Sequence, residues 1–408
     1  MLIISLWFCL HDHGAIPSQA GEIAPFFVQR TNEQPDDFRA WTRLGTALLE
    51  RAQLSGDHRA FRQAQRAFES ALAAHDVYAP ARRGLARSLA GRHAFKEALV
   101  VARQLAISNV PDMEDVLLLG DLHYALGDWV EAQALFLSLG DLADALLRRG
   151  QYALESGHVE NARTIFEKVL TELDDHNPRR VWCETAIALT YSEVDPNKAI
   201  ELLSHITDTD HATWAQLERS KLLIELGRAQ EAVVILNGLV AIHPRPEPQL
   251  MLVRAWRSMG LDQEAQALED SVVRNIEHDV AHGEWGHCRV LANHWIEQGE
   301  HVDRAIKWLE YEHSDIRSDA EGTALLAWAH HLNGQDMEAC KLITPLLASQ
   351  RGAQFMLRAG LILAGAGRIV PARHVLAQAL SREIRGHKPE LKQARLFMEQ
   401  PLNIKVSK

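Results

Sequence analysis

Histidines are concentrated between residues 278 and 301, where metal binding or pH sensing would be possible. The residues with this chemistry are His278, His282, His287, His294 and His301, interleaved with Cys288, Asp279 and Glu284. His278 and His282 are four residues apart, so on a helix they share one face, which suits a metal ion. However, Gly283 and Gly286 interrupt the stretch, and the zincin signature His-Glu-x-x-His is missing.

We therefore take four of these histidines as weak metal candidates: His278, His282, His287 and His294. The chain has 21 histidines, so clusters arise readily by chance, and a solvated polar helix face is the simpler interpretation. A pH-sensitive contact is a further alternative, because several histidines titrate together near neutrality.

Motifs of known catalytic chemistry are absent from the sequence. There is no Gly-rich phosphate loop ending in Lys-Ser/Thr, no nucleophile elbow and no Cys-x-x-Cys pair. The acidic pair Asp36-Asp37 precedes the first expected helix, where it favours the helix dipole. Cys183, Cys288 and Cys340 lie far apart in sequence and are expected to be buried packing residues. We expect no enzyme and no cofactor.

A recurring pattern indicates the elements that position these residues. A loop glycine is followed five residues later by alanine and nine residues later by a large apolar residue, as in Gly127, Ala132 and Phe136. The same pattern starts again at Gly157, Gly227, Gly334 and Gly367. A period of about 34 residues is the signature of a helical solenoid. The alternation typical of strands is missing, so the pattern predicts an all-α chain.

These units resemble the tetratricopeptide repeat (TPR), a helix-turn-helix module. The resemblance is carried in the first unit by Trp41, Leu44, Gly45, Ala64, Phe68 and Ala71, and in a later one by Gly227, Ala232, Leu236, Leu239 and Pro244. Other units depart from it: His93 replaces a loop glycine, Asp195-Pro196 replaces another, and one extra residue follows Gly299. The resemblance implies a right-handed α-solenoid superhelix of about ten TPR-like repeats between Asp36 and Glu383.

The resemblance also implies a concave groove lined by the first helix of each repeat. Positions about ten, six and three residues before the loop glycine would face this groove. They give the candidate partner-binding residues Arg83, Arg87, Gln151, Lys221, Arg254, Arg257, Arg289, Asn293 and Trp328. A largely basic inner row would suit an acidic peptide. The alternative is that these arginines are solvated and serve solubility.

Two details of this row refine the expectation. Arg289 and Asn293 resemble half of the carboxylate clamp with which some TPR proteins hold a peptide C-terminus, but Leu325 stands where the clamp needs a polar residue. Most tryptophans are expected to pack between repeats, and Trp328 is the one we expect to contact a partner.

Composition and charge limit the partners. The net charge of −11 argues against broad nucleic-acid binding, and the body of the protein has no apolar run long enough to cross a bilayer. The apolar run 1–10 followed by Ser18-Gln19-Ala20 predicts a cleaved signal peptide, although a basic start is missing. Cleavage would make the protein periplasmic or secreted, and an uncleaved chain would be cytoplasmic.

We expect four segments: a possible signal peptide at 1–20, an N-terminal capping segment at 21–37, the solenoid at 38–385, and a C-terminal capping helix and tail at 386–408. The function we expect is that of a non-enzymatic scaffold that binds a peptide segment of a protein partner, in bacterial envelope assembly, secretion or protein maturation. Two alternatives stay open: a metal-binding or regulatory subunit acting through 278–301, and a self-assembling array.

Overall fold

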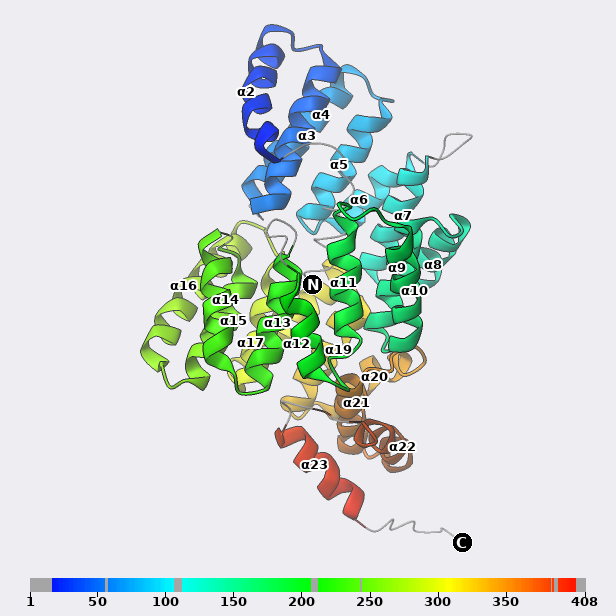
Figure 1. Ribbon diagram of the computed structural model, residues 1–408, viewed down its shortest axis with the longest axis vertical. Helices are drawn as coiled ribbons and strands as arrows, with labels where there is room; N and C mark the ends of the chain where they lie inside the picture. The colour runs from blue at the N-terminus through cyan, green and yellow to red at the C-terminus, as the bar shows by residue number, and fades with distance from the viewer. Residues whose placement is uncertain are drawn as a thin grey trace.

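The computed structural model describes residues 17–55, 58–105, 112–206, 212–242, 244–382, 384 and 388–400. Within these ranges the chain consists of helices and connecting turns, without a strand. Ten successive helix pairs run between α2 (Pro17–Glu33) and α23 (Lys388–Glu399) (Figure 1). The predicted all-α solenoid of about ten repeats is confirmed.

Each pair has a first and a second helix joined by a short turn. The first five pairs are α3 (Phe38–Ser55) with α4 (His58–Ala74), α5 (Ala79–Gly91) with α6 (Phe95–Arg103), α7 (Met113–Leu126) with α8 (Trp129–Ser138), α9 (Ala143–Glu155) with α10 (Val159–Glu172), and α11 (Arg179–Leu189) with α12 (Pro196–Ser204).

The last five pairs are α13 (Thr213–Glu225) with α14 (Ala229–Ile242), α15 (Pro246–Ser258) with α16 (Asp262–Ala281), α17 (Cys288–Gln298) with α18 (Val302–Tyr311), α19 (Ala320–Leu332) with α20 (Asp336–Leu346), and α21 (Ala353–Gly365) with α22 (Ile369–Leu380). The short π-helix η1 (Glu312–Ile316) extends α18. No helix of the described part combines the length and the apolar character that crossing a membrane requires.

The ends of the solenoid are covered by single helices. The segment expected to form the N-terminal cap overlaps α2, which packs on α3. The segment expected at the other end contains α23, which packs on α21 and α22. Residues 1–16 and 401–408 lie outside the described residues, so the expected signal peptide and tail fall largely there.

Most of the described turns inside a pair contain a residue with a left-handed backbone. Gly127, with φ 85°, ends α7 in this conformation, which glycine adopts without a steric penalty. His93 takes the same conformation, with φ 62°, where the pattern lacks its glycine. The unit with Asp195 solves the turn differently, because the Asp195 carboxylate accepts a hydrogen bond from the Lys198 amide and caps α12.

Glycines inside first helices explain how closely the helices approach, both between neighbouring pairs and within a pair. A methyl group on Gly84 would lie 2.2 Å from the Phe68 ring, and one on Gly120 would lie 2.3 Å from the Phe136 ring. Each ring comes from a second helix and is almost completely buried against a glycine of a first helix. Alanines at the closest helix contacts, such as Ala132 and Ala162, are also fully buried. The repeat pattern is therefore a packing pattern.

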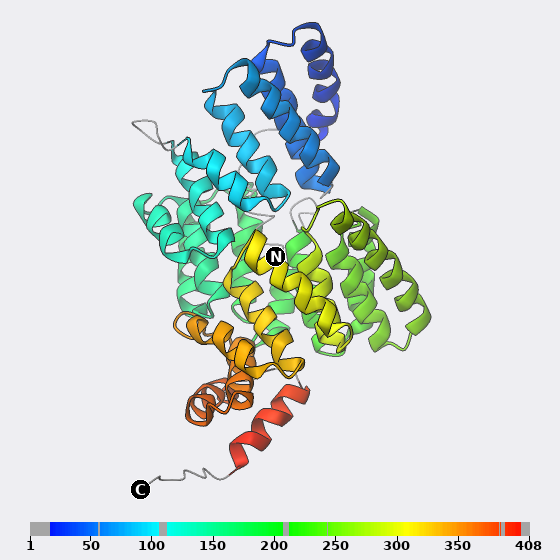
Figure 2. The ribbon, with the colours of Figure 1, turned by 180° about the vertical axis from the view of Figure 1, so that it is seen from behind.

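The superhelix completes a turn and comes back on itself. Lys96 Nζ donates a hydrogen bond to the Ser314 carbonyl at 2.9 Å across 218 positions of sequence. The Ala353 amide donates to Glu193 Oε1 at 3.2 Å across 160 positions. Figure 2 shows the later helices (yellow and orange) lying in front of the middle ones (green) and below the first ones (blue). Successive turns of the solenoid are thus in direct contact.

Candidate partner-binding surface

The predicted groove residues all lie on first helices, as the pattern implied. They are distributed as Arg83 and Arg87 on α5, Gln151 on α9, Lys221 on α13, Arg254 and Arg257 on α15, Arg289 and Asn293 on α17, and Trp328 on α19. Their side chains nevertheless have different surroundings, and most are bound to neighbouring helices.

Arg83 and Arg87 connect their own repeat to the next one. The Arg83 guanidinium is 2.7 Å from Asp115 Oδ1, 2.9 Å from Asp112 Oδ2 and 3.0 Å from Glu114 Oε2. Arg87 Nη2 is 3.4 Å from the same Glu114 oxygen. These carboxylates lie at the start of α7, so both arginines fasten α5 to the following pair.

Two arginines that the groove positions did not include form the same kind of link. Arg148 donates to both carboxylate oxygens of Asp121, at 2.5 and 2.7 Å, and both side chains are buried. Arg179 donates to both oxygens of Asp144 at 2.8 Å. The only sequence signal for these links is an arginine separated from an aspartate by about one repeat, 27 residues for Arg148 and 35 for Arg179. Bidentate geometry makes these links specific.

The structure therefore does not have the expected row of basic side chains that a partner could reach. Arg289 is 3% exposed and is bound by Glu312 and Asp319, at 2.8 Å from Nε and 2.9 Å from Nη1. Arg257 Nη2 is 2.5 Å from Glu269 Oε2. Both arginines were expected to meet a partner, but internal carboxylates occupy them. These lie on the second helix α16 for Arg257, and in η1 and at the start of α19 for Arg289.

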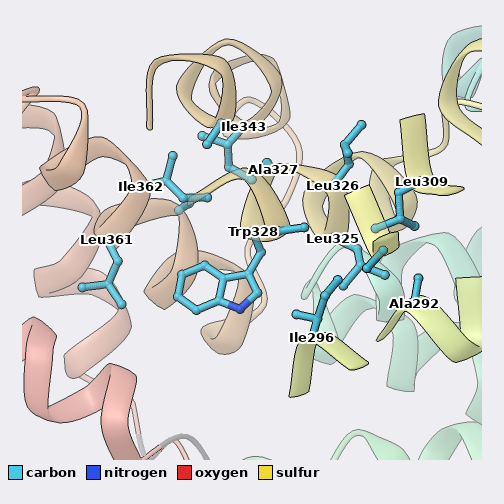
Figure 3. Close-up of a cluster of buried hydrophobic side chains, with 14 of the residues drawn as sticks. Ala292, Ile296, Leu309, Leu325, Leu326, Ala327, Trp328, Ile343, Leu361 and Ile362 are labelled. Atoms are coloured by element: carbon cyan, nitrogen blue, oxygen red, sulfur yellow. The ribbon is translucent and has the colours of Figure 1, made fainter. Parts of the chain in front are cut away.

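Trp328 and Gln151 are also unavailable to a partner. Trp328, expected to contact the partner, is 3% exposed and lies with Leu361 on one side and Ile296 on the other (Figure 3). The Arg358 guanidinium stacks 4.9 Å from its ring centre. Gln151 is completely buried and donates a 2.9 Å hydrogen bond to Glu155. Successive first helices approach each other closely, so these positions lie in the hydrophobic core.

Three predicted groove residues keep solvent access and form, with one carboxylate, the surface we call the inner charged patch. Its members are Lys221, Arg254, Asn293 and Glu297. Lys221 is 48% exposed, and Arg254 is 31% exposed while its Nη1 is 2.8 Å from Glu297 Oε2. Asn293 donates to Glu297 Oε1 at 3.5 Å. The negative charge of Glu218 is the main cause of the raised pKa of Lys221. The charge of Glu297 also raises this pKa, whereas the charge of Arg254 lowers it.

The four weak metal candidates do not form a metal-binding set. His278 and His282 stack at the end of α16, with ring centres 4.3 Å apart. His287 Nδ1 is 3.4 Å from Glu247, whereas His294 is buried with Nε2 2.6 Å from Glu269. Among the described residues, no group of three or more His, Cys, Asp or Glu side chains has the arrangement to hold a metal ion.

Comparisons with known proteins agree with this architecture. Residues 144–175, the α9–α10 pair, match the family model of the tetratricopeptide repeat. A search of curated protein sequences gives no significant match. The chain is thus a helical-repeat solenoid whose unit is a helix-turn-helix pair. Its repeats resemble the tetratricopeptide repeat, and the α9–α10 pair matches the model of that repeat.

Several solved structures are similar in fold at low identity. Yeast Tom70 is 12% identical, with 94% of this chain and 92% of that chain covered and a TM-score of 0.46. The human IFIT1 dimer with PPP-AAAA is 18% identical, with 76% and 72% covered and a TM-score of 0.47. The APC/C hetero-tetramer Cut9-Hcn1 is 14% identical, with 93% and 86% covered and a TM-score of 0.46. These likenesses are too distant to transfer a partner to this chain.

The stacked helix pairs make this chain a rigid helical scaffold. The candidate site on such a scaffold is the accessible part of its inner surface, because rigid helices hold the side chains there in fixed positions.

Proposed function

We propose that the protein binds a peptide segment of a partner protein at the inner charged patch. The observation that carries the proposal is that Lys221, Arg254 and Asn293 occupy three successive first helices and keep solvent access. The other predicted groove residues are held within or between repeats, so this is where the inner surface still offers polar groups to a ligand.

An acidic side chain of the partner fits this surface. It would compete with Glu297 for the Arg254 guanidinium and would lie near the Lys221 ammonium. Both side chains of the Arg254–Glu297 pair are reached by solvent, and solvent-screened pairs contribute only about 0–1 kcal/mol, so exchanging the partner costs little. Asn293 offers an amide that donates and accepts, as an extended peptide backbone requires. Preformed helices lower the ordering cost of binding.

Charge reversal at the patch tests the proposal. In affinity capture from the native organism, the double variant Lys221→Glu and Arg254→Glu is expected to lose proteins that the wild type retains. Arg257 is left unchanged because it holds the buried Glu269, and its reversal would disturb packing. Arg228→Glu is the matched control, since Arg228 is an exposed arginine in the α13–α14 turn paired only locally with Glu231.

Bound proteins are identified by mass spectrometry, and circular dichroism verifies that each variant is folded. Equal recovery of the same proteins by wild type and double variant would exclude the patch as the binding surface. A loss that the Arg228→Glu control shares would indicate a general charge effect instead.

The compartment is a separate proposal that rests on residues 1–20. Of these, 17–20 form the start of α2 and 1–16 lie outside the described residues. We propose export to the bacterial envelope, with a role in assembly, secretion or protein maturation there. Sequencing of the native protein from its N-terminus tests it: a start at Gly21 supports export, whereas an intact Met1 places the protein in the cytoplasm.

A further inference from the structure

A polar cavity of about 400 Å³ lies where the first repeat meets a repeat of the later turn. Its basic lining comes from two parts of the chain that are far apart in sequence. These residues are Arg59 and Arg62 of α4, Arg245 before α15, and His278, His282 and His287 at and after the end of α16. In Figure 2 the early helix pair lies directly above this later part of the chain.

The negative charge of the buried Glu284 in the cavity wall is balanced by two arginines. Glu284 is 4% exposed, and its Oε1 is 3.1 Å from Arg62 Nη1 and 3.0 Å from Arg92 Nη2. Asp279 is the other acidic side chain of the lining. Counted with Arg92, which contacts Glu284, and with Glu247, which contacts His287, four guanidinium groups thus face three carboxylates. In a chain of net charge −11, this cavity has a local excess of positive charge.

Arginine and histidine are also the appropriate donors for an oxyanion. A guanidinium has five N–H donors, so a side chain such as Arg59, Arg62 or Arg245 can contact protein groups and a bound anion at the same time. Its planar arrangement matches phosphate and carboxylate oxygens, and it is charged at every physiological pH. An imidazole adds an N–H donor from its ring. Asn275 and Gln249 add amide donors to the lining.

We propose that this cavity is a binding site for a small phosphate-bearing anion. A volume of about 400 Å³ admits one or two phosphate groups with a small organic substituent. A cation is disfavoured, because the described residues contain no set of three acidic, histidine or cysteine ligands for a metal ion. The site is independent of the inner charged patch, which lies on α13, α15 and α17.

Binding at this place has a structural consequence. The anion is held by α4 on one side and by the α15–α16 segment on the other, so it links two turns of the superhelix. A ligand that binds only the closed arrangement stabilises it in proportion to its free concentration. The cavity therefore couples the concentration of a phosphate compound to the closure of the solenoid.

The test is calorimetric titration of the full chain, purified without phosphate, with inorganic phosphate, pyrophosphate and glycerol phosphate. Wild type is compared with Arg59→Ala and Arg245→Ala, and with Arg228→Ala as an exposed arginine remote from the cavity. Circular dichroism in the absence of ligand verifies folding. We expect at least a tenfold weaker association for each cavity variant and an unchanged value for Arg228→Ala.

The three probes distinguish the sources of the phosphate group. Binding of inorganic phosphate or pyrophosphate identifies free phosphates as ligands, and binding of glycerol phosphate alone identifies a phosphate ester; either result supports the site. Failure of all three to bind, or equal affinities in wild type and Arg59→Ala, overturns it. Arg245→Ala keeps the test decisive if Arg59→Ala fails to fold.

Discussion

The backbone amide of Arg351 donates a hydrogen bond of 2.7 Å to the carbonyl oxygen of Ser156. Ser156 ends α9, and Arg351 lies between α20 and α21, six repeats later. Gly157 follows directly, with φ 79°, and a methyl group on it would lie 2.4 Å from the Gly352 nitrogen. Two turns of the superhelix thus meet backbone to backbone, and a side chain at this glycine would separate them.

Gly157→Ala is expected to open this contact between turns. Alanine costs about 1 kcal/mol in the left-handed conformation and also collides with the Gly352 backbone. Gly227→Ala is the matched control, because Gly227 has φ 76° but nothing within 4 Å of an added methyl group. Small-angle scattering should give a larger radius of gyration for Gly157→Ala only. Equal radii for both variants would show that the contact does not hold the turns together in solution.

Removal of Arg289 should destabilise the segment that joins α18 to α19. Its guanidinium holds Glu312 and Asp319, and all three side chains are buried. Arg289→Ala leaves two buried carboxylates without this partner, a change that costs about 3–5 kcal/mol. Urea unfolding measures the loss, and limited proteolysis should detect earlier cleavage between 312 and 319. An effect as small as that of Arg228→Ala, below about 1 kcal/mol, would contradict the prediction.

The sequence predicted the repeats well because their signals are local. Gly127 with Ala132 and Phe136 specifies a turn, a close helix contact and a buried ring, and each requirement is met within one repeat or its neighbour. The contact between turns was not predictable in this way. It depends on the small rotation that each repeat adds, and this rotation accumulates over many units before Lys96 reaches Ser314.

The sequence predicted on which helices the inner-surface residues lie, but not what surrounds their side chains. Offsets from the loop glycine place Arg254 and Trp328 on first helices, as observed. They do not reveal how closely the neighbouring first helices approach, and that distance decides whether a side chain meets water or core. Trp328 is buried between α17 and α21, whereas Arg254 stays half-buried. The carboxylate partners of Arg83, Arg148 and Arg179 were equally hidden, because they lie about one repeat away.

Two cysteines should resist thiol reagents in the folded protein. Burial is the main cause that raises the pKa of Cys183 and of Cys288 to about 12. An ordinary thiol has a pKa near 8.5, so at pH 8 these two have on the order of a thousandfold less thiolate. In labelling followed by peptide mass spectrometry, both should react only in denaturant. Modification of Cys183 at the rate of a free thiol would contradict its burial.

The buried ion pair at Asp319 should make stability depend on pH in acid. Burial by itself raises the pKa of the Asp319 carboxyl, but the charges of Arg289 and Arg317 outweigh burial and hold the pKa well below its usual range. A carboxyl with a lowered pKa in the folded state stabilises fully above its unfolded pKa of about 3.9 and loses this contribution as pH falls toward the folded value. The stability difference between wild type and Asp319→Asn should therefore be constant between pH 7 and 5 and shrink below pH 4. Urea midpoints at pH 7, 5, 4 and 3 measure it. A difference that stays the same down to pH 3 would mean that Asp319 is not held ionised by these arginines.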